Sequence, residues 1–190
     1  MRIVLASKSP RRRELLRNLF DNFEIITRET DETLPSDVHP SVGVELLAVR
    51  KGDAVAGELE ADALVISSDT LVELGGTPLG KPRDFDDAVK MLSMLSGKTH
   101  HVHTGVAVHY KGSVYSGVDT ADVTFKKLSE NEIVEYVRGG EPMDKAGAYA
   151  IQGGAAKFVE KFEGEFDAIV GLGLKLTKKL IDRAVQNDET

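Results

Sequence analysis

Apolar and polar residues follow two different periods along this chain, and together they predict strands that alternate with helices. Apolar and β-branched runs predict strands at residues 3–6, 23–27, 63–74, 99–110 and 113–125. The pairs Gly75-Gly76 and Lys111-Gly112 lie between strand-like runs and predict hairpin turns. A further hairpin is expected between residues 157–162 and 167–170.

Apolar residues spaced three and four apart predict helices over residues 10–20, 42–54, 84–95, 129–139 and 176–185. Ser9 is placed to cap the first of these helices, with Pro10 in its first position. Gly52 is expected to weaken or interrupt the second helix. Because the helices are interleaved with antiparallel hairpins, we expect an α/β fold with a mixed, partly antiparallel sheet flanked by helices.

Length and composition are those of one compact unit. The chain has 190 residues, of which 41% are hydrophobic, a size at which one compact domain or two tightly joined lobes are usual. The net charge of -7 argues against a stable partnership with a nucleic-acid polymer, although Arg11, Arg12 and Arg13 can make one cleft locally basic. There is no cysteine, no signal-peptide pattern and no apolar run long enough to cross a membrane, so a soluble cytoplasmic protein is expected.

The first candidate for chemistry is the junction between the first strand and the first helix. Ser7, Ser9, Arg11 and Arg12 bring hydroxyl groups and forked donors to the start of a helix, which is suitable equipment for a polyphosphate. The alternative is a capped helix with a solvated basic first turn.

Asp69 is the second candidate, because it interrupts an apolar strand where an aspartate is disfavoured unless its charge is used. It could bind a metal ion or accept a proton from water. The alternative is an exposed edge residue, or an aspartate that is hydrogen-bonded to a nearby turn.

Lys81 and Lys145 lie in loops rich in glycine and aspartate, which either shape anion sites or simply turn the chain. Gln152 offers both a donor and an acceptor that could read the edge of a base, or it is a surface amide. His101 and His103 should face one side of their strand and His100 the other, so we interpret them as structural or surface residues rather than as metal ligands.

These segments together resemble the Maf family of nucleoside triphosphate pyrophosphatases, over nearly the whole chain. The resemblance is carried by LASKSPRR (5–12), SDTLV (68–72), LGKPRD (79–84), LSGKTH (95–100), GEPMDKAGAY (140–149), IQG (151–153) and VGL (170–172). It departs from the family pattern at Gly52, Ala150 and Gly173, where alanine, glycine and proline are usual.

The resemblance implies that residues 1–190 form a single Maf-type domain with two lobes. It also implies an α/β fold with a cleft between these lobes, shared with the inosine triphosphate pyrophosphatases, and a homodimer. It implies that Asp69 is the catalytic proton acceptor, and that Arg11, Thr70 and Gln152 select the substrate in the manner of the dTTP/UTP subgroup. Further polar positions around the cleft correspond to Ser7, Ser9, Arg12, Glu32, Lys51, Lys81 and Lys145.

The implied reaction is hydrolysis of a nucleoside triphosphate to the monophosphate and pyrophosphate. Mg²⁺ or Mn²⁺ held by Asp69 and Glu32 would neutralise phosphate charge, while Ser7, Ser9, Arg12, Lys51, Lys81 and Lys145 would bind phosphates. Two alternatives stay open: the same chemistry on 7-methyl-GTP or deaminated purine triphosphates, and a nucleotide-binding regulator of cell division.

Overall fold

A seven-stranded mixed sheet forms the centre of the computed structural model, which describes residues 1–34 and 38–186. The strand order is β2-β1-β3-β5-β6-β7, with β4 hydrogen-bonded to β3. The strands are β1 (Arg2–Leu5), β2 (Glu24–Ile25), β3 (Ala63–Leu74), β4 (Thr77–Leu79), β5 (Thr99–Tyr110), β6 (Ser113–Phe125) and β7 (Val159–Glu163). β1 is parallel to β2 and β3, and all other pairs are antiparallel. The predicted mixed sheet is therefore confirmed.

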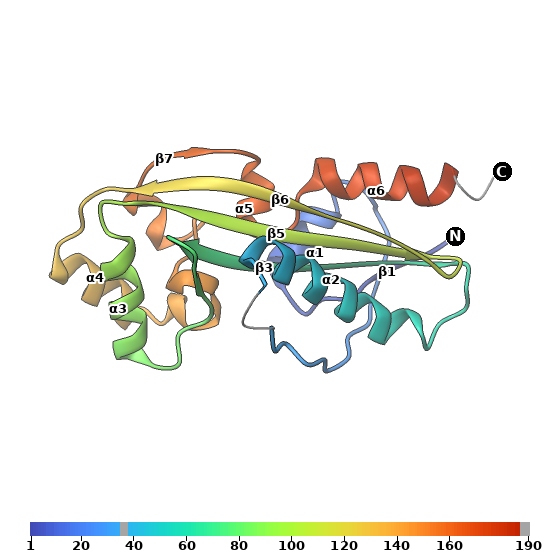
Figure 1. Cartoon of the computed structure of the whole chain (residues 1–190), viewed down its shortest axis with the longest axis horizontal. Coiled ribbons are helices and arrows are strands. Elements are labelled where there is room, and N and C mark those ends of the chain that lie inside the picture. The colour runs from blue at the N-terminus through green and yellow to red at the C-terminus, as the bar shows by residue number, and fades with distance from the viewer. Residues whose placement is uncertain (35–37, 187–190) are drawn as a thin grey trace.

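Helices cover both faces of the sheet at one end and gather at the other end (Figure 1). The α-helices are α1 (Pro10–Leu16), α2 (Pro40–Ala56), α3 (Phe85–Leu95), α4 (Glu130–Arg138), α5 (Phe166–Val170) and α6 (Leu174–Gln186). Three short 3₁₀ helices lie between α4 and β7: η1 (Glu141–Asp144), η2 (Ala146–Ala148) and η3 (Gly154–Phe158). No helix within the described residues is both long and apolar enough to cross a membrane.

Separate apolar clusters form along the sheet. One cluster packs α3, α4 and the 3₁₀ helices against one end of β3, β5 and β6, with Phe125 and Phe158 among its fully buried side chains. A second packs α1 and α6 on the other end, around Leu16 and Leu180, and a smaller one lies beneath α2 at Val65. β3, β5 and β6 run unbroken between both ends, so the apolar clusters at the two ends share one sheet.

Gly52 does not interrupt α2, which runs from Pro40 to Ala56, so the expected interruption was wrong. A β-carbon at position 52 would lie 2.1 Å from Cε1 of His109 and 2.7 Å from the hydroxyl of Ser67. The imidazole of His109 is buried and its Nε2 lies 2.9 Å from a carboxylate oxygen of Asp53. The glycine is thus explained by the close approach of β5 and not by a break in the helix.

The expected hairpin between residues 157–162 and 167–170 was also wrong. β7 instead pairs with β6, and residues 167–170 belong to α5. The chain passes over β6 at Gly164, whose φ is +119° and whose β-carbon would lie 2.7 Å from that of Ala121. Asp167 then accepts hydrogen bonds from the amides of Ala168 and Leu174, which favours two helices in place of a strand.

Candidate active site

A gap along one edge of β3 positions the main cleft. β1 pairs with residues 63–66 of β3 and β4 pairs with residues 72–74, while among the described residues no strand covers residues 67–71 on that edge. A cleft of about 830 Å³ opens at this gap. It is lined by every site residue predicted from the sequence: Ser7, Ser9, Arg11, Arg12, Glu32, Lys51, Asp69, Thr70, Lys81, Lys145 and Gln152.

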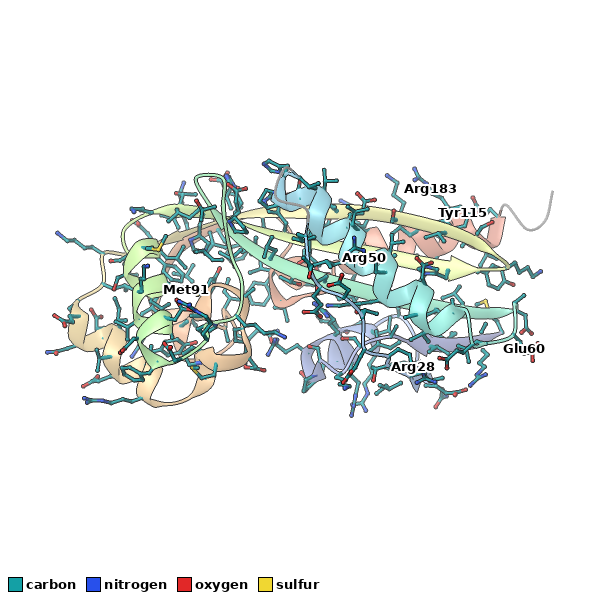
Figure 2. The ribbon with its side chains drawn as sticks, turned by 60° about the horizontal axis from the view of Figure 1, so that its bottom comes forward. Arg28, Arg50, Glu60, Met91, Tyr115 and Arg183 are labelled. Atoms are coloured by element: carbon teal, nitrogen blue, oxygen red, sulfur yellow. The ribbon has the colours of Figure 1, made fainter. Side chains whose placement is uncertain are left out.

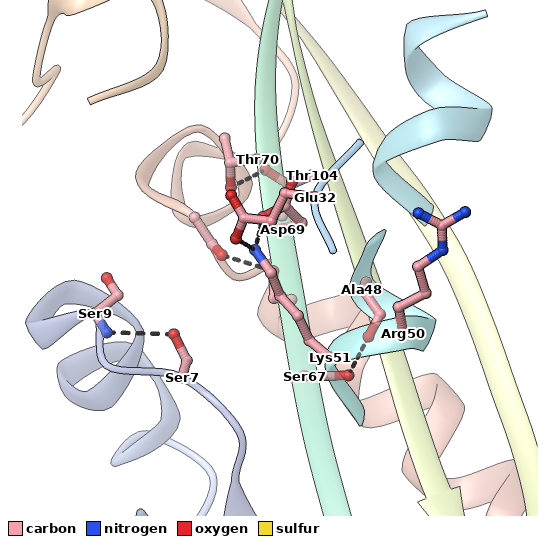
Figure 3. A network of polar contacts seen from close by, with 12 residues as sticks. Ser7, Ser9, Glu32, Ala48, Arg50, Lys51, Ser67, Asp69, Thr70 and Thr104 are labelled. Atoms are coloured by element: carbon pink, nitrogen blue, oxygen red, sulfur yellow. Dashed lines mark hydrogen bonds and ion pairs between the residues drawn. The ribbon is translucent and has the colours of Figure 1, made fainter. Parts of the chain in front are cut away.

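Asp69 lies in the middle of the gap and points toward α2. Its carboxylate lies 2.5 Å from Nζ of Lys51, which lies 2.7 Å from the carboxylate of Glu32 (Figure 3). The hydrogen bond from Lys51 lowers the pKa of Glu32 and outweighs the opposite effect of partial burial. A single ammonium therefore holds two carboxylates that come from a loop and a strand.

Two arginines fix the loop that carries Glu32. Arg50 of α2 donates to the main-chain oxygens of Thr33, at 2.9 Å, and of Asp31, at 3.4 Å. Arg28 forms an ion pair with Glu58 near the end of α2. Both arginines are labelled in Figure 2: Arg50 on α2, and Arg28 near the C-terminal end of that helix. No local pattern in the sequence predicts these contacts, because they depend on where the tertiary fold leaves carbonyl groups unpaired.

Thr70 points to the opposite face of β3, as alternation along a strand requires. Its hydroxyl lies 3.2 Å from a terminal nitrogen of Arg12 and 3.1 Å from the hydroxyl of Thr104. The main-chain oxygen of Gly171 accepts from Nε of Arg12, at 2.8 Å, and from Ser68, at 2.9 Å. Because the edge of β3 is open here, the cleft reaches both faces of the strand.

Arg12 is held by three groups within the protein, since Ser7 also accepts from its guanidinium at 3.2 Å. Withdrawal from water lowers the pKa of Arg12, while the nearby charge of Asp69 opposes that effect. Ser9 caps α1 as predicted, by accepting from the amide of Arg12. The helix has only seven residues, so the arginine side chains are the stronger source of positive charge.

The opposite wall of the cleft carries the other two predicted lysines. Lys81 follows β4 and is exposed. Lys145 is half-buried, contacts Asp144 and donates to the main-chain oxygen of Glu141 at 3.2 Å. Basic side chains outnumber acidic ones around the cleft, although the whole chain is acidic. Such a local excess of positive charge favours a polyanionic ligand.

Gln152 lies exposed on a tight turn at the edge of the cleft, where the amide of Gly153 donates to the oxygen of Ala150. Side chains from other parts of the chain form hydrogen bonds with both ends of this turn. The hydroxyl of Tyr136 accepts from the amide of Ala150 at 3.1 Å, and the carboxylate of Glu141 accepts from the amide of Gly154 at 3.0 Å.

The histidines of β5 make contacts within the protein. His100 is fully buried against Phe125 and is hydrogen-bonded to Tyr149, on the face opposite to His101 and His103. His101 pairs with Asp122, and His103 with Glu73. Within residues 1–34 and 38–186, no group of three or more acidic, histidine or cysteine side chains is arranged to hold a metal ion.

Comparison with known families decides the relationship that these motifs indicate. The family model described as "Maf-like protein" matches residues 2–184, which is nearly the entire chain. The chain belongs to the Maf family.

Curated Maf relatives match over almost their full length. A protein of Pelotomaculum thermopropionicum named "dTTP/UTP pyrophosphatase" is 53% identical over 174 residues, which cover 90% of this chain and 91% of the relative. A protein of Vibrio cholerae with the same name is 46% identical over 182 residues, covering 96% and 97% of the two chains.

The fold of this Maf protein is similar to that of the Staphylococcus aureus Ham1 protein. The TM-score is 0.54, with 15% sequence identity, and the match covers 99% of this chain and 100% of that one. The likeness confirms the predicted fold class. At this identity it concerns the fold alone.

Proposed function

We propose that this Maf protein is a nucleoside triphosphate pyrophosphatase that hydrolyses dTTP and UTP to the monophosphate and pyrophosphate. The supporting observation is the position of Asp69 at the open edge of β3, inside a cleft with basic side chains on both walls. Relatives that are 46–53% identical over at least 90% of this chain carry the name dTTP/UTP pyrophosphatase.

In the proposed reaction, water attacks the α-phosphorus and the bond to the bridging oxygen of pyrophosphate breaks. Asp69 accepts the proton from the attacking water, because it is the carboxylate at the centre of the gap. Lys81 and Lys145 on one wall and Arg11 on the other stabilise the charge that develops on the phosphates. Arg12 contributes from a fixed position, since Ser7, Thr70 and Gly171 already orient its guanidinium.

The carboxylates also fit a divalent cation that arrives with its nucleotide. Mg²⁺ is commonly held by one or two carboxylates together with substrate phosphates, and the cleft offers Glu32 and Asp69 on either side of one ammonium. The cation would supply charge neutralisation at the phosphates. Lys51 occupies the position between the carboxylates and must release at least one of them when such a cation binds.

We propose that base selection lies at Gln152, with Arg11 and Thr70 as the other selecting positions. Gln152 is exposed at the cleft edge and has both hydrogen-bonding groups available for the edge of a uracil or thymine ring. Thr70 would act indirectly, because its hydroxyl is engaged with Arg12 and Thr104.

The test is a panel of dTTP, UTP, CTP, GTP, 7-methyl-GTP and ITP, each with Mg²⁺ or Mn²⁺, scored by pyrophosphate release. We expect the highest kcat/KM with dTTP and UTP. A preference for 7-methyl-GTP or ITP would retain the chemistry and overturn the pyrimidine assignment. Release of inorganic phosphate without pyrophosphate would overturn cleavage between the α and β phosphates.

A further inference from the structure

We infer that Tyr136 and Glu141 are positioning residues that set the nucleobase preference of the cleft, because they clamp both ends of the turn that presents Gln152. This inference rests on the proposed function and identifies what holds its base-selecting group in place. Neither side chain lines the cleft.

The clamp closes on the turn from two sides. The hydroxyl of Tyr136 accepts from the amide of Ala150, which precedes Gln152 by two residues. The carboxylate of Glu141 accepts from the amide of Gly154, which follows Gln152 by two residues, at 3.0 Å and 3.3 Å to its two oxygens. The two ends of a five-residue segment are thereby fixed while its middle residue stays exposed at the cleft.

The two clamping groups lie beside each other. A β-carbon at Gly154 would lie 3.1 Å from the ring of Tyr136 and 3.4 Å from a carboxylate oxygen of Glu141. Burial, together with this nearby carboxylate, raises the pKa of Tyr136. The phenol therefore stays protonated at neutral pH, and its oxygen accepts from the amide of Ala150. Tyr136 is itself fixed, because it is 7% exposed and its ring packs edge-on against Phe158 at 5.2 Å.

The turn is shaped around the carboxylate. A β-carbon at Gly153 would lie 2.0 Å from one oxygen of Glu141 and 2.7 Å from the other. Glu141 can occupy this place only because residue 153 has no side chain. Glu141 also contacts one of the proposed phosphate-binding residues, because its main-chain oxygen accepts a hydrogen bond from Nζ of Lys145 at 3.2 Å.

The experiment compares UTP with CTP, which share the triphosphate and ribose and differ only on the edge of the base. Tyr136→Phe keeps the packed ring and removes the hydroxyl, and Glu141→Ala removes the carboxylate. We expect each variant to lower the UTP/CTP ratio of kcat/KM about tenfold, through KM for UTP, with kcat changed less than about twofold. Glu141→Gln retains one acceptor oxygen and should fall between wild type and Glu141→Ala.

A double-mutant cycle with Gln152→Ala separates positioning from general damage. When Gln152 is absent, Tyr136→Phe should change the UTP/CTP ratio by less than about twofold, because there is no amide left to position. Tyr110→Phe and Glu160→Ala are matched controls on β5 and β7, at positions that do not line the cleft, and should leave the ratio unchanged. Equal loss for both nucleotides, or full additivity with Gln152→Ala, would overturn the inference.

Amide hydrogen exchange gives a readout that needs no turnover. The amides of Ala150 and Gly154 should exchange faster in Tyr136→Phe and Glu141→Ala, respectively, than in the wild type, while the amides of β5 keep their protection. Unchanged exchange at both positions would overturn the clamp. If Glu141→Ala fails to fold, unchanged exchange at Ala150 in Tyr136→Phe, which retains the ring, would overturn it. A wild-type chain that releases no pyrophosphate from UTP would instead contradict the proposed function, and the exchange result would still decide the clamp.

Discussion

Nζ of Lys51 lies 2.5 Å from a carboxylate oxygen of Asp69, so the proposed base is in contact with a cation that the protein itself provides. The same nitrogen lies 2.7 Å from Glu32. The hydrogen bond from this ammonium lowers the pKa of Glu32, which favours the ionised form of that carboxylate near neutral pH.

Replacement of Lys51 by methionine should raise the pKa of Glu32, because the hydrogen bond that lowers it is lost and the charge of Asp69 remains. Carboxyl carbon NMR titration of Glu32 measures the shift. In the wild type, a lowered pKa contributes stability above the ordinary carboxylate pKa, and this contribution is lost as the pH falls. Lys161→Met, which removes an exposed lysine paired with Glu163, is the control and should leave Glu32 unchanged.

Asp69→Asn should reduce kcat for UTP by about 10²–10⁴-fold, the range typical of a lost general base. Asparagine retains the shape of the side chain but cannot accept the proton from water. The measurement is pyrophosphate release at saturating UTP and Mg²⁺, with Asp182→Asn on the exposed face of α6 as the charge-matched control. Near-normal turnover of Asp69→Asn would contradict the role proposed for Asp69.

The effects of substitutions at Gly173 and Asp119 on the free energy of unfolding should depend on each other. A β-carbon at position 173 would lie 1.8 Å from an oxygen of Asp119, so Gly173→Ala should destabilise the fold by about 1–3 kcal/mol, as overpacking does. Removing the carboxylate should relieve the overlap, so Gly173→Ala with Asp119→Ala should cost less than the sum of the two single changes. Urea denaturation of the four proteins measures this difference, and strict additivity would show that the two residues act independently.

Asp119 should also make the free energy of unfolding depend on pH. Burial raises its pKa, and the nearby charges of Asp167 and Glu165 act in the same direction. Because the folded pKa is the higher one, the free energy of unfolding should fall as the pH rises from the ordinary carboxylate pKa through the folded value. Asp119→Asn should remove this contribution, which urea denaturation across that pH range would detect.

His100 should make the free energy of unfolding change with pH in the opposite direction. Burial, with a smaller effect of His101, lowers the pKa of His100 from 6.5 to about 4. The unfolded chain therefore binds a proton first as the pH falls, and the free energy of unfolding should decrease between about pH 6.5 and pH 4. His100→Asn should lower the slope in this range by about one proton.

Features set by neighbouring residues were predictable from the sequence. The strand at Ala63–Leu74, the turn at Gly75-Gly76 and the cap at Ser9 follow from short-range spacing, and the structure contains all three. The predicted helix interruption at Gly52 and the predicted hairpin over residues 157–170 were wrong. The conformations there depend on contacts with β5 and β6, which are distant in sequence.

The residues that line the cleft could be predicted from the sequence, but the residues that hold them in place could not. The chemistry of Asp69 and the basic residues, joined by the Maf motifs, identified side chains that do line one cleft. The supporting roles of Arg50, Tyr136 and Glu141 could not be predicted from the sequence. These side chains bind main-chain groups that only the folded chain leaves unpaired. The roles of the individual residues, the divalent cation, the homodimer and the cytoplasmic location stay predictions.

The unbroken course of β3 between the apolar clusters at the two ends of the sheet limits how the cleft can move. A hinge between two domains needs a few residues that absorb large dihedral changes, but residues 67–71 are hydrogen-bonded to β5 throughout the gap. Opening and closing must therefore come from the loops on the walls or from a change in twist of the whole sheet. The spacing between the walls is thus fixed largely before a nucleotide arrives, which reduces the ordering cost of binding.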